Sequence, residues 1–184
     1  MKRILLALLI GILLANCADK NNEPTDLTNL EKAQGGNETK LEFIEEWNQL
    51  ELTQTDDKYG EWGGDTDRIL IYFNEKNIFA DYSKYLGSKE PPMPPKENEK
   101  PKKWFEHKKL DYKIDSVKLN TYQLELIEKA IIELTKLRIN SKSHPFSSEF
   151  VNSVISSDSS LILKNYQSNQ WKSFQKLKKS IIDK

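Results

Sequence analysis

The stretch ILIYFNEKNIFADYSKY, residues 69–85, contains two runs of strand-forming residues on either side of a short polar connection. Ile69 to Phe73 is rich in β-branched and aromatic residues, which fit a pleated and partly buried surface. Asn74 to Asn77 forms the connection, and Ile78 to Tyr85 continues as a second strand. The stretch therefore predicts an antiparallel hairpin.

Strand patterns continue on both sides of this hairpin. Residues 41–55 have apolar spacing that fits a helix at first and a strand later, so we expect a short helix or extended lead-in followed by a strand ending near Thr55. Alternation of apolar and charged residues predicts a strand from Leu110 to about Leu119. A second hairpin is expected from Phe150–Ile155 and Leu161–Tyr166, around a serine-rich turn.

Two segments have the apolar spacing of amphipathic helices. The first runs from about Thr121 to Leu137, and Asn120 and Gln123 resemble a capping box at its start. The second runs from about Asn169 to Ile182. Its expected inward residues are Trp171, Phe174, Leu177 and Ile181. The predicted fold class is therefore α+β, an antiparallel sheet of hairpins with two main amphipathic helices packed on it.

Composition and charge exclude several classes of protein. Among 184 residues, 28 are basic, 28 are acidic and one is a cysteine. A single cysteine excludes internal disulfides and cysteine-rich zinc sites, and two isolated histidines predict no metal site. Zero net charge gives no reason to expect nucleic acid. We predict no cofactor.

Charge is nevertheless uneven along the chain. Residues 17–57 carry eleven acidic and three basic side chains, whereas residues 164–184 carry six basic and one acidic. The basic end could attract anionic lipid head groups or an acidic partner, or could be a solvated helix face.

The N-terminus has the pattern of an export signal. Lys2 and Arg3 precede the apolar run Ile4 to Ala15, which is shorter than the roughly 20 residues that a membrane-spanning helix needs. The sequence Leu14-Ala15-Asn16-Cys17 follows. It resembles the lipobox of bacterial lipoproteins, matching at Leu14, Ala15 and Cys17 and departing at Asn16, where the family usually has Gly, Ala or Ser.

This resemblance implies a signal peptide at residues 1–16 and a mature chain that begins with a lipidated Cys17. Residues 17–40 are polar and are expected to form a disordered, flexible tether, followed by a single domain at 41–184. That domain includes an exposed loop at 87–103, which holds five of the seven prolines. The implied location is the bacterial cell envelope, with the protein anchored to its inner or outer membrane. The alternative is that Cys17 is an ordinary residue of a signal peptide cleaved elsewhere.

The segment between the first two predicted strands is the most distinctive of the folded part. Two adjacent glycines stand among Glu61, Trp62, Asp65 and Asp67, which are the candidate residues for binding a ligand or partner. Carboxylates could also bind a cation, but the spacing does not match a calcium loop. A plain turn with Trp62 folded onto the core is the other interpretation.

The sequence assigns no catalytic residue and keeps two classes of function open. We favour a non-enzymatic envelope lipoprotein that binds a protein or envelope ligand through the Trp62 loop and the proline loop, as an immunity protein or inhibitor would. The alternative is a small envelope hydrolase that uses Glu61, Asp65 or Asp67 as acid and base. The serine-rich turn at 156–160 lacks the G-x-S-x-G elbow of serine hydrolases.

Overall fold

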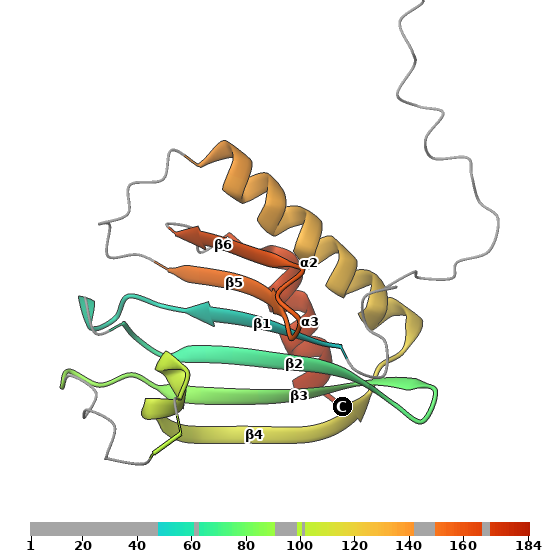
Figure 1. Ribbon diagram of the computed structural model, residues 1–184, viewed down its shortest axis with the longest axis horizontal. Helices are drawn as coiled ribbons and strands as arrows, with labels where there is room; N and C mark the ends of the chain where they lie inside the picture. Colours follow the sequence, from blue (N-terminus) through green and yellow to red (C-terminus); the bar gives the residue numbers. More distant parts are fainter. Residues whose placement is uncertain (1–47, 61–62, 91–98, 101, 142–149, 167–169) are drawn as a thin grey trace, which may run out of the picture. The chain divides into compact units, whose positions relative to one another are not determined.

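The structure is a computed structural model that describes residues 48–60, 63–90, 99–100, 102–141, 150–166 and 170–184 (Figure 1). All of them belong to the unit Thr39–Lys184. Predictions for the signal peptide, Cys17, the tether, Glu61, Trp62 and most of the proline loop lie outside the described residues.

Six strands form one antiparallel sheet in the order β4-β3-β2-β1-β5-β6. Their bounds are β1 Gln49–Thr55, β2 Thr66–Asn74, β3 Asn77–Leu86, β4 Lys109–Lys118, β5 Val151–Ser156 and β6 Ile162–Tyr166. The central hairpin β2–β3 turns through Glu75 and Lys76, whose φ angles of 47° and 66° are left-handed. Turns of this kind match the twist of the strands that they join. Both predicted hairpins are confirmed.

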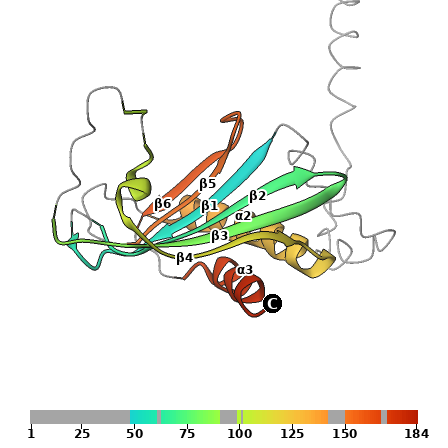
Figure 2. The ribbon, with the colours of Figure 1, turned by 90° about the horizontal axis from the view of Figure 1, so that it is seen from below.

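Two helices, α2 (Thr121–Asn140) and α3 (Lys172–Ile182), pack on the same face of the sheet (Figure 2). The capping box at the start of α2 is confirmed, because Asn120 and Gln123 exchange hydrogen bonds of 3.0 Å. The four residues expected to point inward from the last helix are all buried. They belong to one hydrophobic core cluster with the apolar side chains of the central strands. The α+β prediction is therefore correct.

The opposite face of the sheet, which we call the open face, has no long helix among the described residues. A single turn of 3-10 helix, η3 (Trp104–His107), lies over it and buries Phe105. The Phe105 ring contacts Tyr85, with centroids 5.4 Å apart, and lies 5.6 Å from the Arg68 guanidinium carbon. This apolar anchor directly after the proline-rich segment was not predicted.

The strand register places the β1–β2 and β3–β4 connections at the same end of the sheet. Thr55 pairs with both Thr66 and Val151, and Thr66 pairs with Tyr85. The segments after β1 and β3, and the one before β5, therefore start or finish at this end, which we call the loop end (left in Figure 1). None of the described helices is long and apolar enough to cross a membrane.

Candidate functional site

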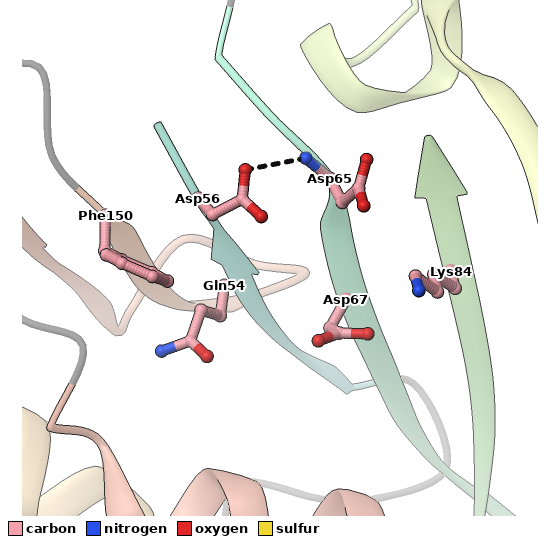
Figure 3. A pocket seen from close by; sticks show the side chains of 6 residues that line it. All are labelled: Gln54, Asp56, Asp65, Asp67, Lys84 and Phe150. Atoms are coloured by element: carbon pink, nitrogen blue, oxygen red, sulfur yellow. Dashed lines mark hydrogen bonds between the residues drawn. The ribbon is translucent and has the colours of Figure 1, made fainter. Parts of the chain in front are cut away.

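A pocket of about 120 Å³ opens on the helix side of the sheet at the loop end (Figure 3). We call it the acidic pocket, because three carboxylates and one lysine line it. Its lining residues are Gln54, Asp56, Asp65, Asp67, Lys84 and Phe150. They come from β1, β2 and β3, from both ends of the β1–β2 connection and from the residue before β5, so the pocket exists only in the assembled sheet.

Asp56 organises the chain that follows β1. Its Oδ1 accepts hydrogen bonds from the backbone nitrogens of Lys58, at 3.1 Å, and Asp65, at 2.9 Å. Gly64 makes this contact possible, since a β-carbon at that position would lie 1.4 Å from Oδ1 of Asp56. In the part of the chain that the structure describes, Oδ2 of Asp56 accepts no hydrogen bond.

Asp65 joins two connections of the sheet. Its Oδ1 accepts a hydrogen bond of 2.9 Å from the backbone nitrogen of Gly87, directly after β3. Its Oδ2 lies 3.8 Å from Nζ of Lys58, whose side chain is 54% exposed. Such an exposed and long ion pair contributes little to stability. Oδ2 of Asp65 is therefore available to a ligand, as is Oδ2 of Asp56.

Asp67 belongs to β2, whereas the sequence placed it in the loop. Both its oxygens are engaged, because Oδ1 accepts from the Tyr82 hydroxyl and Oδ2 from Nζ of Lys178, each at 2.6 Å. Burial raises the pKa of Tyr82 far above its ordinary value, and the hydrogen bond to Asp67 adds to the effect. Asp67 thus fastens α3 to the sheet.

Gln54 and Lys84 complete the walls. Gln54 donates to Oδ1 of Asn152 at 2.8 Å and accepts from Gln175 of α3, which fixes its amide. Lys84 pairs across the ladder with Asp67. The ammonium of Lys84 makes no hydrogen bond or ion pair with the described residues, so it is free to move toward or away from the pocket.

Lys108 contacts the end of the β1–β2 connection, where β2 begins. Its Nζ donates to the carbonyl oxygen of Gly64 at 2.6 Å and to Oγ1 of Thr66 at 3.0 Å. Burial lowers the pKa of Lys108, and the charges of Asp56 and Asp65 oppose that shift. The segment that follows η3 is therefore fixed to the start of β2, and the loop end is braced from both faces of the sheet.

Of the four candidate residues, the structure brings Asp65 and Asp67 to one pocket, while Glu61 and Trp62 lie outside the described residues. Sequence reasoning missed Asp56, Gln54 and Lys84. The alternation of β1 could have indicated Gln54, since it shares a face with Leu50 and Leu52. No local signal marks Asp56.

The acidic pocket is a negatively charged site that suits a basic ligand. No group of three or more His, Cys, Asp or Glu that could hold a metal ion occurs in the described ranges. The two available oxygens, Oδ2 of Asp56 and Oδ2 of Asp65, are negatively charged hydrogen-bond acceptors, and a basic group is their natural complement.

Comparisons of this chain with protein-family models, with curated proteins and with solved structures find no match.

Proposed function

We propose that this protein is a lipid-anchored protein of the bacterial cell envelope whose folded domain binds a protein partner at the loop end of its sheet. The lipobox-like sequence ending at Cys17 supports the anchor. The acidic pocket supports the binding role, and it is the observation on which that role depends. No catalytic step is part of the proposal.

The partner would present a basic side chain to the acidic pocket. Asp67 is already paired with Lys178, so recognition depends on Asp56 and Asp65. The Oδ2 atom of each accepts no hydrogen bond from the described residues. A guanidinium with two donating edges could hydrogen-bond to both carboxylates, and its charge would strengthen each bond. Lys58, 3.8 Å from Asp65, would be displaced into solvent at little cost because it is already half-exposed.

The structural contacts make acid–base catalysis by these carboxylates the weaker alternative. A general acid or base must reach the proton that it transfers, yet both oxygens of Asp67 are held by Tyr82 and Lys178. Asp65 keeps one accessible oxygen. A hydrolase would therefore have to work with Asp65 and a second group, and Asp56 is the candidate within the same pocket.

The binding role is tested by site-specific photocrosslinking in intact cells. A photoreactive residue replaces Lys84, at the acidic pocket, and in a matched control replaces Lys113 of β4. We expect a crosslinked partner from position 84 only, and loss of that product when Asp56→Asn and Asp65→Asn are combined. Crosslinking that is equal at the two positions, or unaffected by the double change, would contradict the proposal.

The anchor is tested separately with an alkyne-tagged fatty acid. The parent chain is expected to incorporate the label and the Cys17→Ala chain to lose it. Equal labelling of the two chains would refute the lipid anchor, and it would leave the crosslinking result at the pocket unaffected.

A further inference from the structure

A second pocket, of about 250 Å³, lies on the open face beside η3. We call it the open-face pocket. It is lined by three charged residues, Glu51, Arg68 and Lys103, by the apolar side chains of Leu70 and Ile155, and by serines of the β5–β6 turn, including Ser157 and Ser159. It shares no lining residue with the acidic pocket.

Glu51 occupies the floor of this pocket and is fully engaged. Only 6% of its side chain is exposed. Its Oε2 accepts from Nε of Arg68 and from Nζ of Lys103, both at 2.7 Å, and its Oε1 also accepts from Lys103, at 2.8 Å. A carboxylate bonded in this way has a fixed position, and so do the two cations that it holds.

Arg68 keeps its outer edge unused. Nε is bonded to Glu51, while the two terminal nitrogens have no hydrogen-bond partner among the described residues. The Phe105 ring lies 5.6 Å from its guanidinium carbon, and 16% of the side chain is exposed. A guanidinium that is held on one edge and open on the other presents the paired donors that a planar carboxylate accepts.

The charge of the lining favours an anion. Glu51 neutralises one of the two cations, so the residues that line the pocket carry one net positive charge. The nearby Asp158 is not a lining residue, and its Oδ1 accepts hydrogen bonds from Ser156 and Ser160 within its own turn. Leu70 and Ile155 provide an apolar wall beside the charges.

We propose that the open-face pocket binds a single carboxylate group carried on a short apolar body. The carboxylate lies against the outer edge of Arg68 with Lys103 beside it, and the apolar body lies over Leu70 and Ile155. The single net positive charge of the lining matches one carboxylate. This site does not depend on the partner proposed for the loop end.

The test uses the isotopically labelled full chain and follows the Nε–H signal of Arg68 by NMR. Hexanoate is the probe, and hexan-1-ol and hexylammonium are its neutral and cationic counterparts. We expect a saturable shift at roughly millimolar hexanoate, as for other small probes, and none with the two counterparts. No saturable shift with hexanoate, or an equal one with hexan-1-ol, would overturn the proposal.

A filled pocket provides the second test without removing a charge. Ile155→Trp places an indole over the apolar wall, and we expect the dissociation constant for hexanoate to rise at least tenfold. Ile162→Trp is the matched control, because Ile162 pairs with Ile155 across the ladder but does not line the pocket. Unchanged affinity in Ile155→Trp would place binding elsewhere and refute the site.

Two sources of the carboxylate are distinguished by a further pair of probes. A tetrapeptide with a free C-terminal carboxylate, ending in leucine, is compared with its C-terminal amide. Binding of the free peptide alone, more tightly than hexanoate, identifies a chain terminus as the ligand. Tighter binding of hexanoate identifies a free organic acid, and both results support a carboxylate site.

Discussion

Gly87 approaches Gly64 so closely that a β-carbon on Gly87 would lie 2.6 Å from the carbonyl carbon and oxygen of Gly64. The two glycines belong to different connections of the sheet, one after β3 and the other before β2. Their contact brings the backbone nitrogen of Gly87 to Asp65, which accepts its hydrogen bond. The shape of the acidic pocket depends on this absence of side chains.

Replacement of Gly87 by alanine is therefore expected to destabilise the fold. The added methyl group has no space against backbone atoms, and overpacking of this kind costs about 1 to 3 kcal/mol. Urea denaturation measures the loss. Gly60→Ala is the matched control, because its φ of 61° is left-handed but no atom lies within 4 Å of the added carbon. Its cost is about 1 kcal/mol, and a larger loss there than at Gly87 would contradict the role of close packing.

The second prediction concerns alkaline pH and Tyr82. Burial and then Asp67 raise the folded-state pKa of Tyr82 above its unfolded value of about 10. A raised pKa means that the folded state favours the protonated phenol. The resulting stability is fully present below about pH 10 and is lost as pH rises further, by up to about 1.4 kcal/mol per pH unit.

Tyr82→Phe removes this dependence. Its free energy of unfolding, measured with urea between pH 9 and 11.5, is expected to fall less steeply than that of the parent. Tyr122→Phe makes the same chemical change at a residue that is 55% exposed, and it should follow the parent curve. Parallel curves for the parent and Tyr82→Phe would show that Tyr82 titrates normally.

Local patterns were enough to predict most elements of this fold. The hairpin β2–β3, the capping box of α2 and the buried face of α3 each depend on residues close together in the sequence. Strand alternation also indicated that β1 ends near Thr55, and it ends at Thr55. These features depend on backbone preferences and side-chain periodicity, which act over a few residues.

The features that were missed depend on distant parts of the chain. In the sheet β1 lies between β2 and β5, and Leu52 pairs with both Ile69 and Val154. No local pattern shows this, because Val154 is far from Leu52 in the sequence. Glu51 alternates with two leucines and has the pattern of a solvent-facing residue, yet Lys103 and the segment around Phe105 cover it. Both candidate pockets form only when such segments meet.

The third prediction concerns acid pH and the turn between β5 and β6. Hydrogen bonds from the Ser156 hydroxyl, and then from the nitrogen and hydroxyl of Ser160, lower the pKa of Asp158 to about 2. Because the pKa is lower in the folded state, the ionised carboxylate stabilises the fold at pH values above the unfolded-state pKa of about 4. This contribution is lost as the pH falls through about 2. NMR of the side-chain carboxyl carbon measures the titration directly.

Ser156→Ala removes the largest of these contributions and is expected to move the midpoint of Asp158 toward 4. Ser160→Ala keeps the backbone hydrogen bond, so a smaller shift is expected there. An unchanged midpoint in Ser156→Ala would show that its hydroxyl does not hold the carboxylate in solution.

The last prediction compares the stability contributed by a buried ion cluster with that of an exposed ion pair of similar N···O distance. Glu51 lies 2.7 Å from both Arg68 and Lys103 and is 6% exposed, whereas Asp115 lies 2.6 Å from Lys113 and is 53% exposed. Glu51→Gln leaves the largely buried Arg68 without its counter-charge, which costs about 2 kcal/mol or more. Asp115→Asn is expected to change the free energy of unfolding by less than about 0.5 kcal/mol, because water already screens that pair. Urea denaturation of both variants measures the difference, and equal losses would show that the covering segment at 103–107 does not exclude water from Glu51.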